Sequence, residues 1–165
     1  MGKSDRDFTK YFFCKTFYKQ PNLHLVFKSE KYLKHFKEPH ITSSKKSAFI
    51  KIQKKIKNID NFKKGEWWVQ DFSSMIPLAI NNHINNSNIL DMCAAPGGKA
   101  FQLLLNNNVI LNDINKNRII KLKENLSRLK FNPEIKNING LDYNEDIKYD
   151  IVLVDSPCSS IGTIR

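Results

Sequence analysis

The sequence predicts an α/β fold in which a doubly wound parallel sheet follows a small α+β region. From Asn88 onwards, short apolar runs alternate with polar stretches of helical periodicity, which is the strand–helix–strand–helix–strand order of such sheets. The run at 151–154, IVLV, is apolar at every position, as expected for a strand buried on both faces. Residues 1–64 differ in texture, being dense in Lys, Phe and Tyr. We therefore expect two parts, residues 1–64 and residues 65–165.

The smaller, N-terminal part is expected to hold two strands and a short helix. The run at 23–27, LHLVF, reads as extended, and residues 48–52 contain Phe49 and Ile50, which favour strands. Residues 30–37 are expected to form one or two helical turns that Pro39 stops. The Lys-rich segment 43–64 is either a basic strand-and-loop region or a linker.

The larger part is expected to contain four parallel strands joined by helices. The helix at 114–129 has the strongest pattern, because one face is apolar and the other charged; the apolar face holds Ile119, Leu122, Leu126 and Leu129. Pro77 lies inside another expected helix and shifts its start or kinks it. Strands are expected at 88–90, 109–111, 133–138 and 151–154, and helices at 71–84, 99–105 and 114–129.

The charge, the cysteine and histidine content and the absence of long apolar runs limit the classes of protein to which this sequence can belong. The chain has 165 residues and a net charge of +11, for which there are two explanations: a polyanionic partner, or surface lysines that accumulated in an AT-rich genome. Three widely spaced cysteines predict no disulfide framework, and the four histidines lack the spacing of metal ligands, so no metal site is expected. No secretory signal or membrane span is recognisable, which predicts a cytoplasmic protein without a membrane partner.

The first chemical motif is the run from Ile89 to Ala100, ILDMCAAPGGKA. It places small residues and glycines between a strand and a helix, at the strand end where open α/β sheets bind ligands. It is neither a dinucleotide fingerprint nor a phosphate-binding P-loop. An isolated Pro-Gly-Gly would be an ordinary turn, whereas the whole run is much more particular.

Two aspartates follow the next two expected strands. Asp113 lies about fifteen residues after the glycines and either accepts the ribose hydroxyls of an adenosine or caps the helix that begins at Asn115. Asp142 either holds the amino group of an adenine or is a solvated turn residue.

The last motif is the run from Ile151 to Arg165, IVLVDSPCSSIGTIR. An apolar strand delivers Asp155, and Pro157 then restricts the backbone beside Cys158. Asp155 and Cys158 would point into the ligand crevice; alternatively, Cys158 is a small buried hydrophobic residue, as most free cysteines are.

Together, DMCAAPGGKA and VDSPCSSIGTIR resemble the RNA 5-methylcytosine methyltransferases of the Sun/RsmB/Nop2 type. The motifs of that family read D-x-C-A-A-P-G-G-K-T and D-x-P-C-S-x-x-G-x-x-R, so Ala100 replaces a usual threonine. The segment GEWWVQD, residues 65–71, also resembles the one that precedes the catalytic domain in bacterial members. The resemblance extends from about Pro21 to the last residue. It implies a partial class I methyltransferase (Rossmann-like) sheet beside a small N-terminal α+β RNA-binding subdomain.

The resemblance also implies roles for individual residues. The loop would line the methionine end of the cofactor S-adenosylmethionine with Cys93, Ala94, Ala95, Pro96, Gly97, Gly98 and Lys99. Asp113 would bind the ribose, Asp142 the adenine side, and Asp155 would lie between cofactor and cytosine. Cys158 would be an auxiliary cysteine that helps to release the product.

The implied function is transfer of a methyl group from S-adenosylmethionine to C5 of cytosine in RNA, with ribosomal RNA as the expected substrate and a monomer as the expected state. A cysteine thiolate adds to C6 of the unstacked base in this chemistry, which makes C5 nucleophilic. The family's attacking cysteine lies in a later Thr-Cys-Ser motif that this sequence lacks, and four strands are found where the fold has seven. The sequence therefore predicts a fragment. The alternatives are a non-catalytic RNA- and S-adenosylmethionine-binding module, or a class I methyltransferase acting on DNA or protein.

Overall fold

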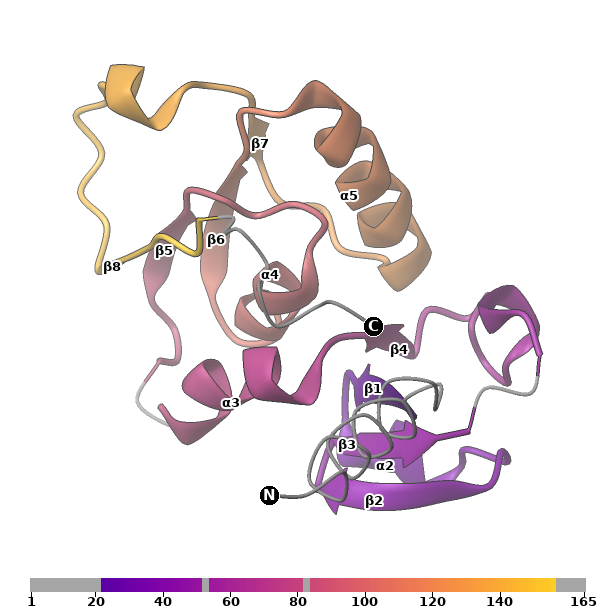
Figure 1. Ribbon diagram of the computed structural model, residues 1–165. Helices are drawn as coiled ribbons and strands as arrows, with labels where there is room; N and C mark the ends of the chain where they lie inside the picture. Colours follow the sequence, from indigo (N-terminus) through magenta and orange to yellow (C-terminus); the bar gives the residue numbers. More distant parts are fainter. Residues whose placement is uncertain (1–21, 52–53, 82–83, 157–165) are drawn as a thin grey trace, which may run out of the picture.

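In a computed structural model, the described part of the chain forms two four-stranded sheets, one antiparallel and one parallel (Figure 1). The structure describes residues 22–51, 54–81 and 84–156. The antiparallel sheet comes first in the chain, and the parallel sheet follows with its helices. The expected α/β class with a parallel sheet is confirmed.

The antiparallel sheet has the strand order β2-β3-β1-β4. Its elements are β1 (Leu23–Phe27), α2 (Glu30–Lys34), β2 (His40–Ser44), β3 (Ser47–Ile50), the 3₁₀ turn η1 (Ile56–Asn58) and β4 (Trp67–Val69). The two expected strands are present, and the expected helix is shorter, ending at Lys34. Two further strands, β2 and β4, were not expected. Because β4 pairs with β1, the antiparallel sheet continues past the boundary expected at residue 64 and reaches Val69.

Strand β4 packs into two hydrophobic cores through adjacent tryptophans. Side chains alternate between the faces of a strand, so Trp67 and Trp68 point in opposite directions. Trp67 packs with Phe27 and Phe36 in the core of the antiparallel sheet, whereas Trp68 packs in the core of the parallel sheet. The Trp68 ring meets that of Phe101 edge-on, with ring centres 5.8 Å apart. The two sheets are therefore joined by packed aromatic rings rather than by a linker.

The parallel sheet has the order β7-β6-β5-β8. Its elements are α3 (Phe72–Ile80), β5 (Asn88–Asp91), α4 (Gly98–Leu103), β6 (Asn108–Asn112), α5 (Lys116–Leu129), β7 (Ile135–Lys136), the 3₁₀ turn η2 (Gly140–Asp142) and β8 (Ile151–Leu153). Counted along the chain from β5, this is the order 3-2-1-4 of one side of a Rossmann sheet, as the alternating pattern predicted. Helix α3 contains Pro77 and begins after Asp71, whose carboxylate accepts a hydrogen bond from Ser73 N.

The expectation that residues 151–154 are buried on both faces is wrong. Strand β8 is the outer strand of the parallel sheet within the described residues, and Val152 is 53% exposed. Its all-apolar sequence therefore lies at a sheet edge with only one strand beside it.

Helix α5 buries the predicted apolar face and anchors its last turn on the antiparallel sheet. The Arg128 guanidinium donates to the carbonyl oxygens of Phe62 at 3.1 Å and Trp67 at 2.9 Å. Lys28 of β1 donates to the carbonyl of Leu129 at 2.5 Å. Gly65, with φ +70°, lies so close that an added Cβ would be 1.9 Å from the Arg128 carbonyl oxygen. These contacts fix the position of the antiparallel sheet relative to α5.

Candidate functional site

A crevice of about 450 Å³ lies at the carboxyl ends of β5 and β8. The strand order reverses between these two strands, and open α/β sheets bind ligands at such switch points. Its walls come from the loop after β5, the end of β8 and the connection from β4 to α3. The lining residues are Val69, Gln70, Asp71, Ser74, Asp91, Cys93, Ala94, Ala95, Pro96, Gly97, Gly98, Lys99, Arg118, Asp155 and Ser156. The structure thus brings together the whole predicted loop and Asp155.

Backbone hydrogen bonds hold the loop after β5 in place. Cys93 N donates to the Asp91 carboxylate at 3.2 Å, and Ala94 N donates to the carbonyl of Asn112 at 2.9 Å. Gly97 has φ +123°, and an added Cβ would lie 1.9 Å from the ring of Phe101. A residue with a side chain would therefore be strained here and would displace a buried ring.

Asp113 directly follows β6, is 2% exposed and holds this loop in place through its carboxylate. One carboxylate oxygen accepts from Ala95 N at 3.1 Å, and the other accepts from Asn115 N at 2.9 Å. Arg118 contributes an ion pair to Asp113 at 3.5 Å and donates to the Ala95 carbonyl. The cap of α5 is Asn115, which accepts from Arg118 N at 3.1 Å, so Asp113 does more than start the helix.

Asn112, the neighbour of Asp113, ties together the carboxyl ends of adjacent strands. It is 1% exposed, and its amide both donates to the Ile138 carbonyl at 2.9 Å and accepts from Ile138 N at 3.0 Å. The segment after β7 is thereby fixed beside the loop after β5, which lies at the same edge of the sheet.

Three carboxylates and two cations line the crevice, namely Asp71, Asp91, Asp155, Lys99 and Arg118. Lys99 forms an ion pair of 2.5 Å with Asp155. Asp91 is 1% exposed, and burial, with a smaller contribution from the nearby Asp155 charge, raises its pKa to about 7. Burial and the surrounding carboxylates raise the pKa of the Cys93 thiol, so it is not an activated thiolate. The lining therefore offers carboxylates to a positively charged group of a ligand and cations to a negatively charged one.

Sequence reasoning missed several of these residues. Asp91 ends an apolar strand and was noted only as part of its motif, although an acid directly after buried residues signals a perturbed carboxyl group. Gln70, Asp71 and Ser74 belong to the segment around GEWWVQD and form one wall of the crevice. The Gln70 amide accepts from the Trp68 indole at 2.9 Å and donates to Gln102 at 2.6 Å, which locks this wall to α4.

The remaining predicted site residues are Asp113, Asp142 and Cys158, and Asp113 is not among the residues that line the crevice. Asp142 is exposed in η2 and is not among the residues that line the crevice. Cys158 lies outside the described residues.

In the part of the chain that the structure describes, no cluster of three or more His, Cys, Asp or Glu could hold a metal ion. Over the same residues, no helix has the length and apolar character needed to cross a membrane.

The strand order and the crevice define a Rossmann-like α/β domain with a switch-point ligand site, the architecture of S-adenosylmethionine-dependent methyltransferases. Residues 77–165 match the family model described as 16S rRNA methyltransferase RsmB/F. This match covers more than half of the chain, and the chain belongs to that family, whose cofactor is S-adenosylmethionine.

Curated relatives agree with this assignment. Proteins from Photorhabdus laumondii and Proteus mirabilis, both described as ribosomal RNA small subunit methyltransferase B, are 38% and 36% identical over 113 residues. These alignments cover 65% of this chain but only 26% and 27% of the relatives. The chain thus spans about a quarter of the length of the curated relatives it matches.

Solved structures show the same fold. A methyltransferase homologue from Pyrococcus horikoshii has a TM-score of 0.72 at 24% identity, with 91% of this chain and 55% of that chain covered. NSun6 from Pyrococcus horikoshii, solved with the S-adenosylmethionine analogue SFG, has a TM-score of 0.55 at 33% identity. That alignment covers 64% of this chain and 29% of NSun6.

Proposed function

We propose that this chain supplies the donor-binding part of an S-adenosylmethionine-dependent RNA (cytosine-5)-methyltransferase that acts on ribosomal RNA. The observation that carries the proposal is the crevice at the β5–β8 switch point, where the Cys93–Lys99 loop faces Asp155. Bound S-adenosylmethionine supplies a methyl group activated by a positively charged sulfur. The Asp91 and Asp155 carboxylates of the crevice attract such a cationic ligand, and Asp91 does so once it ionises at about pH 7.

In this proposal each side chain has a definite task. Residues Cys93–Lys99 hold the methionine end of the donor, and Asp155 lies between the donor and the target base. Asp113 is proposed to bind the ribose; because it is 2% exposed and is not a lining residue of the crevice, this contact requires Arg118 to move away from it. Asp142 contacts the adenine side, which requires the ligand to extend from the crevice towards η2. Cys158 assists product release.

The N-terminal subdomain, expected in residues 1–64 and continued by β4 to Val69, is proposed to bind the RNA. The charge distribution supports this part of the proposal. Residues 22–69 contain twelve lysines and four acidic residues, whereas residues 70–165 contain ten basic and ten acidic residues. Lysines that had accumulated without function would be spread over both parts, and an excess confined to one part is typical of a polyanion-binding surface.

Isothermal titration calorimetry tests donor binding on this chain. S-adenosylmethionine should bind, and Asp155→Asn should weaken its binding more than that of the uncharged product S-adenosylhomocysteine. Methyl transfer is then followed with a labelled donor and ribosomal RNA, and the RNA is digested to look for 5-methylcytidine. No donor binding would refute the proposal, a labelled nucleoside other than 5-methylcytidine would refute the chemistry, and donor and RNA binding without transfer would favour the non-catalytic module.

A further inference from the structure

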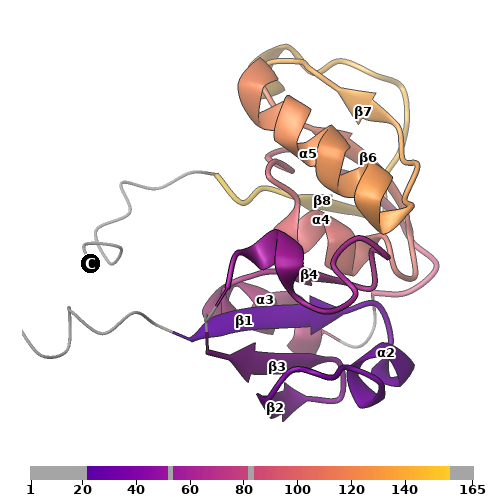
Figure 2. The ribbon, with the colours of Figure 1, turned by 90° about the vertical axis from the view of Figure 1, so that its right-hand side faces the viewer.

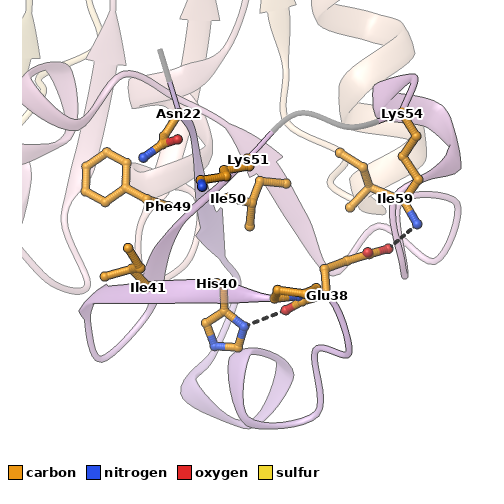
Figure 3. Close-up of a pocket in the computed structure, with 10 residues that line it drawn as sticks. Asn22, Glu38, His40, Ile41, Phe49, Ile50, Lys51, Lys54 and Ile59 are labelled. Atoms are coloured by element: carbon orange, nitrogen blue, oxygen red, sulfur yellow. Dashed lines mark hydrogen bonds and ion pairs between the residues drawn. The ribbon is translucent and has the colours of Figure 1, made fainter. Parts of the chain in front are cut away.

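A second cavity, of about 510 Å³, lies at one end of the antiparallel sheet (Figure 3). It is formed where β1 begins, β2 begins and β3 ends, and we call it the strand-end pocket. Its lining residues are Asn22, Glu38, Pro39, His40, Ile41, Phe49, Ile50, Lys51, Lys54 and Ile59. The volume is within the range of about 300–1,000 Å³ that small-molecule sites occupy.

The walls of the strand-end pocket combine flat apolar surface with positive charge. Ile41 and Phe49 are paired across β2 and β3, so their side chains lie on the same face of the sheet. Ile41 is 69% exposed, and the Phe49 ring is half-buried. Lys51 and Lys54 also line the pocket; Figure 3 shows Lys51 beside Phe49, whereas Lys54 lies next to Ile59 and pairs with Glu38 at 2.5 Å. An aromatic ring with a lysine beside it is what a nucleotide requires for its base and its phosphate.

Lys51 has its charge available for a ligand. Among the residues that the structure describes, only Lys34 and Lys54 of the twelve lysines in residues 22–69 lie within ion-pair distance of a carboxylate. Lys51 is exposed at the end of β3 and borders the apolar wall formed by Phe49. An anionic group bound there would be held by an otherwise unpaired cation.

The strand-end pocket and the crevice are connected by neighbouring rings. The ring centroids of Phe49 and Phe72 lie 5.5 Å apart. Phe72 directly follows Asp71, which lines the crevice. Figure 2 shows the beginning of β1, the end of β3 and the end of β8 on the same side of the molecule. One extended chain could therefore occupy both sites without crossing the protein.

We propose that the strand-end pocket binds one unstacked nucleotide of a single-stranded RNA whose neighbouring segment enters the crevice, with the base against Phe49 and Ile41 and the phosphate at Lys51. This inference rests on the proposed RNA-directed function and specifies where the substrate is held. An enzyme that acts on a base must take it out of the stack, and the flanking bases then need surfaces of their own.

The test measures RNA affinity by fluorescence anisotropy, with a labelled single strand of roughly ten nucleotides. Phe49→Leu removes the ring but keeps most of its volume, and it should weaken binding about tenfold, since one stacked base contributes roughly 1–3 kcal/mol. Lys51→Glu should also weaken binding and lower the salt dependence by about one ion. The charge-matched control is Lys31→Glu, on α2 at the other end of the sheet.

Donor affinity, measured on the same preparations, separates the possible failures. All three variants should bind S-adenosylmethionine like the parent, which also shows that they fold. If the parent binds the donor but no RNA, the RNA-directed function fails together with this inference. If RNA binds and both pocket variants behave like Lys31→Glu, the strand-end pocket alone is refuted. Equal competition by an acidic peptide would also overturn the assignment to RNA. If Phe49→Leu does not fold, the comparison of RNA affinity between the exposed variant Lys51→Glu and its control Lys31→Glu still tests the pocket.

Discussion

Replacing Asp91 by asparagine should stabilise the protein, and the gain should grow with pH. Asp91 is almost fully buried, and burial raises its pKa to about 7 from the 3.8 of an unperturbed aspartate. Its folded-state pKa is therefore higher than its unfolded-state pKa, so the folded protein binds the proton more tightly. It follows that the stability of the parent falls as pH rises from about 4 to about 7 and then levels off. Asparagine has the same shape and can still accept from Cys93 N, without a charge to bury.

The size of the stability difference follows from the difference between the folded-state and unfolded-state pKa values of Asp91. Each unit of pKa difference corresponds to about 1.4 kcal/mol. Near pH 5 Asp91 is ionised only in the unfolded chain, which lowers the stability of the parent by roughly 1–2 kcal/mol. The penalty approaches roughly 4 kcal/mol near pH 8, where the group is ionised in both states. The advantage of Asp91→Asn over the parent should thus increase by on the order of 2–3 kcal/mol between these conditions.

Urea unfolding of parent and variant at both pH values measures this difference. Parallel stability curves would show that Asp91 ionises normally and that its burial has no electrostatic consequence. The same variant should bind S-adenosylmethionine more weakly near pH 8, because the carboxylate that destabilises the fold is one that favours a cationic donor. A variant that is more stable and binds the donor as tightly as the parent would contradict the role given to Asp91.

Three further substitutions test the site and its support. Lys99→Met removes an ion pair whose Asp155 partner is largely exposed, so the free energy of unfolding should change by less than about 1 kcal/mol. Calorimetry should nevertheless show at least about tenfold weaker donor binding, and unchanged binding would contradict the role of Lys99 in holding Asp155. Gly65→Ala places a Cβ 1.9 Å from the Arg128 carbonyl oxygen and should cost about 2–4 kcal/mol in urea unfolding, whereas a neutral result would mean that α5 and the antiparallel sheet separate easily. Asn112→Ala leaves the partly buried backbone groups of Ile138 without their side-chain partner and should lower stability by about 1–2 kcal/mol in thermal unfolding. Asn112→Asp should retain part of this stability, because its carboxylate can still accept from Ile138 N.

The parallel sheet could be predicted because its elements carry strong local patterns. Helix α5 buries the four residues that its periodicity indicated, and strands β5 and β6 fall on the expected apolar runs. The loop after β5 was also predictable, because its glycines and small residues are needed for local backbone geometry. Gly97 shows this directly through its positive φ and its contact with Phe101.

The strands β2 and β4 could not be predicted from local pattern. Four of the five residues of β2 are exposed, so it shows no alternation of apolar and polar residues and is held by backbone pairing with β3. Strand β4 is only three residues long, and its tryptophans serve two different cores. Tertiary packing decides such strands, because short exposed or doubly buried segments lack a period.

The role of Asp113 was only partly accessible for a related reason. Its place at a strand end was visible in the sequence, but its bond to Ala95 N joins residues eighteen positions apart and depends on the fold. The crevice wall formed by the β4–α3 connection was not predictable for the same reason. Gln70 lies at the crevice because β4 pairs with β1 in the antiparallel sheet, and that pairing depends on the fold.

The adjacent tryptophans of β4 make this short strand intolerant of changes in length. Inserting or deleting one residue directly before Trp67, with the pairing to β1 kept, would exchange the directions of Trp67 and Trp68, because the side chains of a strand alternate with a period of two. Each indole would then face the wrong interior, and both hydrophobic cores would be disrupted by a single codon. The tip of the β2–β3 hairpin at Lys45 and Lys46 is exposed and should accept the same insertion with little effect.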